Sequence, residues 1–122
     1  MTDTYVAGQV QTVLGTIDPG DLGVTLCHEH LLVDVSSFMD PPTDQPDIAF
    51  YEAPLSLENL GYVRHYHAPN FDNGILDDVD IAIEEARRYA ESGGRSVIDV
   101  TSLGIGRNPQ GLEQISRETG LN

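Results

Sequence analysis

The fold of this chain follows from Thr25-Leu26-Cys27-His28-Glu29-His30-Leu31-Leu32, in which two histidines come directly after a short apolar run. In a β-strand, successive side chains point to opposite faces, so His28 and His30 project to the same side. Their Cα atoms are expected about 6.5 Å apart, from a rise of about 3.3 Å per residue. Two imidazoles at that spacing can share one metal ion, each at about 2.0–2.1 Å. Because the motif is short, two polar histidines without a metal are an equal alternative.

The residues on either side of His28, Cys27 and Glu29, point to the opposite face and are not expected to ligate the same ion. We expect Cys27 to be a small buried apolar side chain, since no nearby cation would activate its thiol. We expect Glu29 to form a structural salt bridge or hydrogen bond. The order His-Glu-His differs from His-Glu-x-x-His, which needs histidines at i and i+4 on a helix.

The segments around this strand alternate between strand and helix patterns. Residues 9–14 and 24–28 are β-like, and the turn signal Asp18-Pro19-Gly20-Asp21 between them predicts an N-terminal hairpin. Residues 34–54 are rich in Pro and Asp and predict a long loop. Ser56 is predicted to cap a short helix over residues 57–64.

The second half of the chain shows the clearer signals. Apolar spacing predicts a helix over residues 75–92 that Gly93-Gly94 ends, followed by a buried strand over residues 96–101. Asn108-Pro109 predicts the start of another helix, which Gly120 ends. This order predicts a parallel α/β architecture, which could begin either a barrel or a doubly wound sheet.

Three blocks resemble, in the same order, the start of the phosphotriesterase-related family of amidohydrolases. They are Gly8–Ile17 with Leu22–Asp34, Ser56–Gly61 with Asp80–Glu85, and Gly93–Thr101 continuing to Arg107. The resemblance implies a TIM (β/α)₈ barrel, which typically needs about 250 residues. We therefore expect residues 1–122 to be a truncated N-terminal segment of one hydrolase domain, comprising a β-hairpin and the first two βα units.

The same resemblance implies a divalent-metal-dependent hydrolase that cleaves ester, lactone, amide or phosphotriester bonds through a metal-bridging hydroxide. His28 and His30 would ligate the first of two ions, with zinc the expected metal. The family takes its remaining ligands, including a bridging carboxylated lysine or glutamate, from later strands, and this chain contains no lysine. We expect the chain alone to be inactive and the complete enzyme to bind a small-molecule substrate, as a homodimer in many members. No catalytic residue is assigned.

Two other functions stay open at this point. The chain could be a non-catalytic derivative of such an enzyme that binds a partner through unpaired strands. It could also be a simple two-histidine metal-binding module, although two ligands give poor affinity and selectivity.

Other polar residues are weaker candidates. His65 and His67 form a second His-x-His, expected to be a solvated or loop-packed pair. Asp99 shares a strand face with Val97 and Thr101 and is expected to satisfy backbone donors, with orientation of a metal ligand as the alternative. Arg107 is expected to anchor a tight turn, with substrate contact as the alternative.

The composition excludes some classes of function. Twenty acidic residues stand against six arginines, giving a formal net charge of −14. That charge argues against nucleic acid and anionic membranes as partners. The sequence shows neither an apolar run of about 20 residues nor a signal-peptide pattern in residues 1–15, and the single cysteine cannot form an internal disulfide. We therefore expect a cytoplasmic location.

Overall fold

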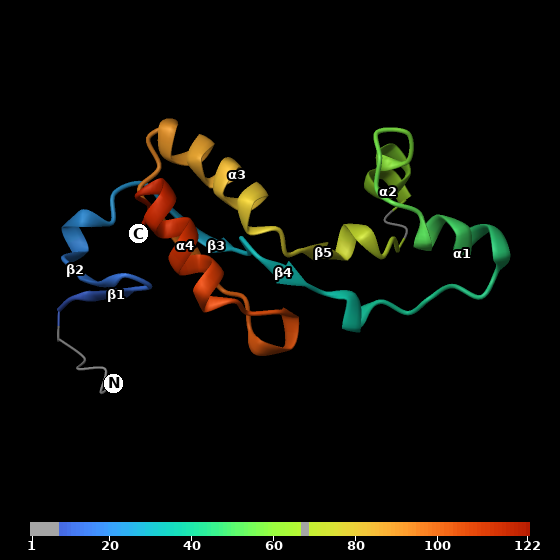
Figure 1. Cartoon of the computed structure of the whole chain (residues 1–122), viewed down its shortest axis with the longest axis horizontal. Coiled ribbons are helices and arrows are strands. Elements are labelled where there is room, and N and C mark those ends of the chain that lie inside the picture. The colour runs from blue at the N-terminus through green and yellow to red at the C-terminus, as the bar shows by residue number, and fades with distance from the viewer. Residues whose placement is uncertain (1–7, 67–68) are drawn as a thin grey trace. The chain divides into compact units, whose positions relative to one another are not determined.

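The computed structural model describes residues 8–66 and 69–122, which form two compact units. We call residues 8–32 with 78–122 the βαβ unit and residues 33–77 the insertion unit. The strands of the described residues are β1 (Val10–Thr12), β2 (Gly15–Ile17), β3 (Thr25–Glu29), β4 (Val33–Asp34), β5 (Ile75–Leu76) and β6 (Ser96–Asp99). The helices are α1 (Gln45–Glu52), α2 (Leu60–Tyr66), α3 (Val79–Glu91) and α4 (Pro109–Thr119), drawn in Figure 1.

The centre of the βαβ unit is a parallel pair of strands, β3 and β6, that are connected through α3. Thr25 pairs with Ser96 at the start of this ladder. On the other edge of β6, Asn122 donates its N–H to Arg95 O (2.9 Å) and accepts from Val97 N (3.0 Å). The predicted parallel α/β arrangement is confirmed for these elements.

The helices α3 and α4 begin and end where local sequence signals place them. The Asp78 carboxylate accepts from the backbone N–H groups of Asp80 and Ile81, which satisfies the first turn of α3. Asn108 caps α4 in the same way, with Pro109 at the first helical position. Gly120 ends α4 in the left-handed conformation, at φ 71°.

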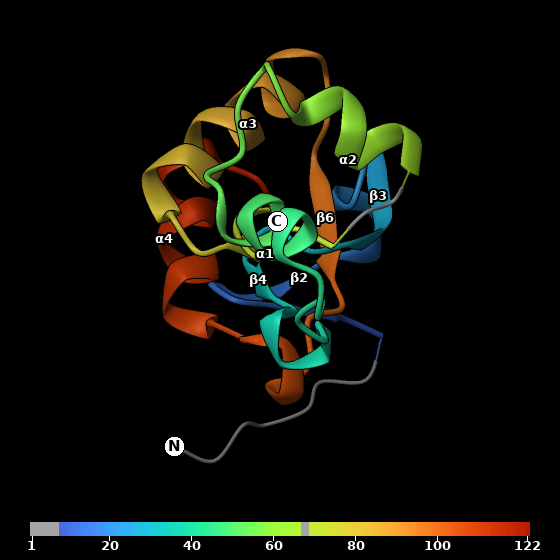
Figure 2. The same ribbon diagram turned by 90° about the vertical axis from the view of Figure 1, so that its right-hand side faces the viewer.

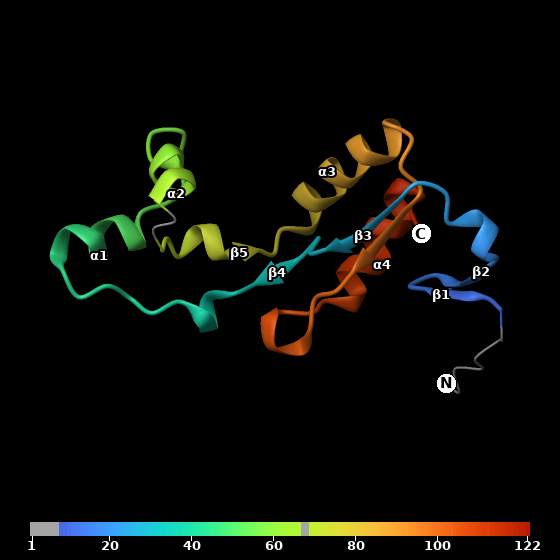
Figure 3. The same cartoon turned by 180° about the vertical axis from the view of Figure 1, so that it is seen from behind.

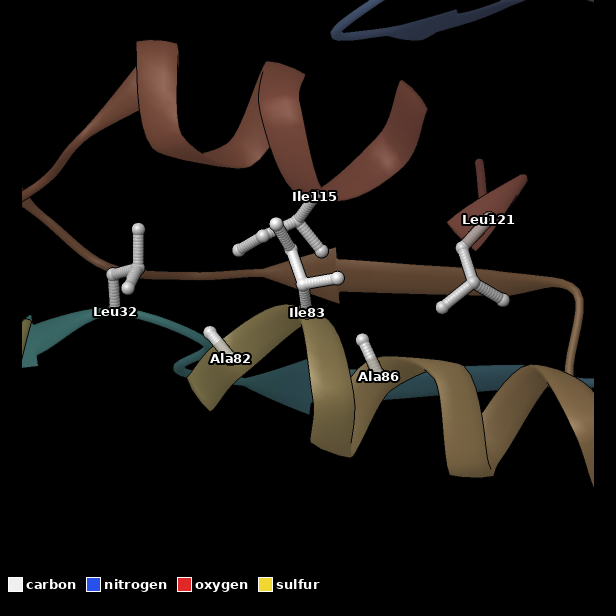
Figure 4. Packing of buried hydrophobic residues seen from close by; sticks show 6 residues of the cluster. All are labelled: Leu32, Ala82, Ile83, Ala86, Ile115 and Leu121. Atoms are coloured by element: carbon white, nitrogen blue, oxygen red, sulfur yellow. The ribbon is translucent and has the colours of Figure 1, made fainter. Parts of the chain in front are cut away.

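The two helices contact each other and cover one face of the strand pair, as Figure 2 shows. Ile83 and Ala86 of α3 meet Ile115 of α4 in a buried cluster, which Leu32 and Leu121 extend at the strand ends (Figure 4). Burial of such side chains contributes about 1.5–3 kcal/mol each for the larger residues. Val97 of β6 and Leu31, which follows β3, pack against this cluster, so it lies beside the strand pair.

The N-terminal hairpin exists, but its position differs from the prediction. It joins β1 to β2 in antiparallel register, Val10 with Ile17, and its turn is Val13-Leu14. The predicted turn at residues 18–21 is instead a short 3₁₀ helix, Pro19–Asp21, in which the Asp18 carboxylate accepts from Gly20 N (2.8 Å). This local side-chain bond explains why an Asp-Pro-Gly-Asp signal gave no hairpin turn.

The insertion unit contains more regular structure than predicted. Helix α1 lies within the segment predicted as a long loop, and β4 pairs with β5 in antiparallel register. Ile75-Leu76 therefore belong to a strand rather than to the predicted helix, which begins at Val79. Helix α2 begins at Leu60 and not at residue 57, and Asn59 Oδ1 accepts from Ser56 N (2.8 Å) before it.

The described residues form three two-stranded sheets and do not close a barrel. A hairpin followed by two parallel strands, each with a helix after it, matches the predicted opening of a (β/α)₈ barrel. Within the part of the chain that is described, no helix has the length and apolar character that crossing a membrane requires.

Candidate metal site at the end of strand β3

The two histidines of the motif lie at the C-terminal end of β3, which Figure 3 shows beside β6. His28 is in the strand and His30 directly follows it. Their ring centroids are 5.9 Å apart, with the ring planes at 78°. The ladder shifts register here, because Leu26 pairs with Val97 but Glu29 pairs with Asp99. Such shifts re-aim side chains and are common beside functional sites.

The His30 ring is held from one side by a threonine of the neighbouring strand end. Its Nδ1 lies 2.9 Å from Thr101 Oγ1, although the two residues are 71 positions apart in the sequence. Thr101 is 5% exposed, and its Oγ1 also lies 3.3 Å from Leu32 O. With Nδ1 engaged, the nitrogen of His30 that remains for a ligand is Nε2.

Asp99 joins the ends of β3 and β6 to each other. Its Oδ2 accepts from Leu31 N and its Oδ1 accepts from Thr101 N, both at 2.9 Å. The predicted role of Asp99 in satisfying backbone donors is confirmed. One donor, Leu31 N, is next to His30, and the other belongs to Thr101, the hydrogen-bond partner of His30. The carboxylate therefore fixes the backbone near the point from which the side chains of His30 and Thr101 project.

His28 differs from His30 in its surroundings. It is exposed, and within residues 8–66 and 69–122 its ring contacts the His30 ring and makes no hydrogen bond. An exposed side chain without such bonds can change its rotamer at little cost. Two imidazoles that share one tetrahedral ion at about 2.0–2.1 Å have centroids about 5 Å apart, so a small rotation of His28 suffices.

The donor set therefore fits part of a metal centre. Two neutral imidazole nitrogens are suitable ligands for zinc and similar divalent ions. The described residues contain no group of three or more His, Cys, Asp or Glu side chains placed to hold an ion. A catalytic zinc site generally uses three protein ligands, so residues 8–66 and 69–122 supply two of them at most.

Two expectations for the residues on either side of His28 are wrong. Cys27 is exposed rather than buried. The Glu29 side chain forms no ion pair or hydrogen bond with any residue that the structure describes, although its carbonyl accepts from Val100 N (2.9 Å).

The remaining candidates lie elsewhere. Arg107 lines a mostly apolar cavity of about 620 Å³ that extends from the β1–β2 hairpin along β6 to α4, and neither His28 nor His30 lines it. His65 is in α2 of the insertion unit, and His67 lies outside the described residues. Thr101 was missed as a contact of His30. Its place on the Asp99 face of the strand was visible, but the partner depends on the pairing of β3 with β6.

Comparison with known proteins places this geometry in a family. Residues 8–122 match the family model described as the phosphotriesterase family. The chain is 36% identical over 118 residues to an N-acetyltaurine hydrolase of Tetraodon nigroviridis, covering 96% of this chain and 34% of that protein. It is 38% identical to a phosphotriesterase-related protein of Drosophila melanogaster, covering 93% and 33%.

Solved structures with similar folds also point to this family. A resiniferatoxin-binding protein from Rhodobacter sphaeroides matches with a TM-score of 0.88 and 43% identity, over 94% of this chain and 32% of that one. An organophosphorus hydrolase from Deinococcus radiodurans matches with a TM-score of 0.58 and 27% identity, over 93% and 26%. The chain spans about a third of the length of the curated relatives it matches. On its sequence and its fold, this chain belongs to the phosphotriesterase family.

Proposed function

We propose that the protein containing this chain is a divalent-metal-dependent hydrolase, and that His28 and His30 are ligands of its first metal ion. The observation that carries the proposal is the pair of imidazoles 5.9 Å apart at the end of β3, with His30 Nδ1 already hydrogen-bonded to Thr101. Family membership over residues 8–122 supports it. The ends of barrel strands are where such enzymes place their catalytic groups.

The roles of the residues follow from their surroundings. A bound divalent cation would lower the pKa of a water molecule and polarise a carbonyl or phosphoryl oxygen of the substrate. His30 supplies a ligand whose orientation is set in advance, and His28 supplies one that can rotate into place. Asp99 keeps the two strand ends at a fixed separation. Further ligands would come from parts of the protein other than the described residues.

The substrate class we propose is a small molecule with an ester, lactone, amide or phosphotriester bond. Relatives of this chain are named N-acetyltaurine hydrolase, lactonase and organophosphorus hydrolase, so hydrolysis is common to them while the bond differs. Zinc as the metal, a homodimer as the assembly and the cytoplasm as the location belong to the same proposal. A formal net charge of −14 gives no support to nucleic acid as a partner.

The test is the metal content of the full-length protein in which both histidines are replaced. We expect His28→Ala with His30→Ala to lose the first metal and the hydrolytic activity together, measured by mass spectrometry of the metal and by ester and lactone hydrolysis. His65→Ala, a histidine of the insertion unit, is the control and should keep the metal. Unchanged metal content in the double variant would overturn the assignment. A wild-type protein that binds no metal would favour the non-catalytic alternative.

A further inference from the structure

We infer that Thr101 is a positioning residue for His30: its hydroxyl selects Nε2 as the nitrogen that faces the metal and fixes the ring for that purpose. The inference rests on the proposed function, since it assigns to Thr101 a role in the same metal site. It starts from one contact, His30 Nδ1 to Thr101 Oγ1 at 2.9 Å.

The direction of that hydrogen bond follows from the second partner of Thr101. Leu32 O lies 3.3 Å from Thr101 Oγ1 and can only accept. The single hydroxyl proton of Thr101 therefore goes to Leu32, and Oγ1 accepts the proton carried by His30 Nδ1. A neutral imidazole with its proton on Nδ1 has its lone pair on Nε2, which is the form that binds a metal through Nε2.

The position of the hydroxyl is fixed by burial and by the backbone. Thr101 is 5% exposed, so water does not compete for its hydroxyl. Asp99 accepts from Thr101 N through Oδ1 and from Leu31 N, next to His30, through Oδ2, so one carboxylate ties the backbone of Thr101 to that of the neighbour of His30. A ligand oriented in this way loses less conformational freedom on binding a metal than a free one such as His28.

The change that tests this is Thr101→Val, which keeps the shape of the side chain and removes the hydroxyl. Loss of a group that orients a metal-binding histidine typically weakens metal binding about 10–100-fold. We expect that loss for Zn²⁺ in the full-length protein, measured by competition with a chelator. Thr101→Ser keeps the hydroxyl and should restore binding close to the wild-type value.

A matched control separates the hydroxyl of Thr101 from hydroxyls in general. Ser116 is also buried, and its Oγ donates to the backbone carbonyl of Leu121 in the same unit. Ser116→Ala removes a buried hydroxyl of the same kind without touching His30. Zn²⁺ affinity should stay within about twofold of the wild type in this variant, whatever it does to thermal stability.

A second measurement does not depend on the metal. Nitrogen-15 NMR of the metal-free protein under alkaline conditions reports which ring nitrogen of His30 carries the proton. We expect the Nδ1–H form to dominate in the wild type and in Thr101→Ser, and both forms to be populated in Thr101→Val. If Thr101→Val keeps both the Nδ1–H form and its Zn²⁺ affinity, the inference is overturned. If the wild type binds no Zn²⁺ but shows this tautomer shift, the proposed function fails while the positioning of His30 by Thr101 stands.

Discussion

The βαβ unit and the insertion unit hold their elements together in different ways. In the βαβ unit, a cluster of buried aliphatic side chains that includes Ile83 and Ile115 packs against a parallel strand pair. In the insertion unit, Asn70 is the most buried side chain, at 1% exposed, and bonds to the backbone. The βαβ unit is therefore distinguished by a continuous apolar cluster, whereas the insertion unit combines a buried polar side chain, satisfied by its hydrogen bonds, with the buried Tyr51 and Val63.

This difference has a consequence for the candidate site. A packed apolar cluster resists local opening, because any displacement exposes several side chains at once. His30 and Thr101 lie at the end of the strand pair that this cluster supports, with Leu32 of the cluster accepting from Thr101. The insertion unit contributes no residue to this cluster, so changes in its loops leave the packing of the cluster unaltered.

The largest effect should come from the βαβ core. Ile115 is 2% exposed and contacts the cluster from α4, so Ile115→Ala removes buried area and leaves a cavity. We expect it to lower the free energy of unfolding by about 2–5 kcal/mol, measured by urea denaturation of the full-length protein. The control is Ile81→Ala on α3, where the side chain is 60% exposed and the change should stay within about 0.5 kcal/mol. Equal effects of the two substitutions would mean that this cluster is not the core.

The same contrast explains how much of the fold could be predicted. The start of α4 at Asn108-Pro109 and its end at Gly120 were correct, because caps are local signals that need no tertiary partner. Helix α1 was missed because its apolar residues do not form a clear helical face. Its C-terminal turn is fixed by Asn70, which donates to Phe50 O and Ala53 O from 17 to 20 residues away.

The residues of the candidate site likewise differ in whether local sequence is enough to predict them. His28 and His30 could be found from their spacing, since a strand places alternate residues on one side. The role of Thr101 could not, because it depends on which residue of β6 pairs with which residue of β3 across the register shift. The exposure of Cys27 was likewise beyond reach, since the absence of a nearby cation in the sequence says nothing about which elements cover the side chain.

A smaller effect, confined to the insertion unit, should follow from Asn70→Ala. The side chain donates to two carbonyls at 2.9 Å and accepts from Asn73 N at 3.0 Å, so its loss leaves buried groups unpaired. We expect the free energy of local opening to fall by about 1–3 kcal/mol, measured by hydrogen exchange of the α1 amides. Asn59→Ala is the matched control, because Asn59 makes the same types of bond at exposed positions. If amides of α3 and α4 lose protection equally, the two units do not open separately.

The smallest effect is expected at Asp34, a half-buried residue at the start of the insertion unit. Hydrogen bonds from the Ser36 side chain and from its backbone N–H, the latter at 2.9 Å, lower the pKa of the Asp34 carboxyl. A lowered pKa means that the folded state favours the carboxylate, so Asp34 contributes to folding stability at pH values above the ordinary pKa of Asp. This contribution to stability is lost as the pH falls through the lowered pKa of the folded state.

Ser36→Ala removes the larger of the two causes and should raise the Asp34 pKa toward its ordinary value, measured by NMR titration of the carboxyl carbon. An unchanged pKa would assign the shift to the backbone bond instead. The metal affinity of the protein should be the same in this variant, because Asp34 and Ser36 belong to the insertion unit while His30 and Thr101 belong to the βαβ unit.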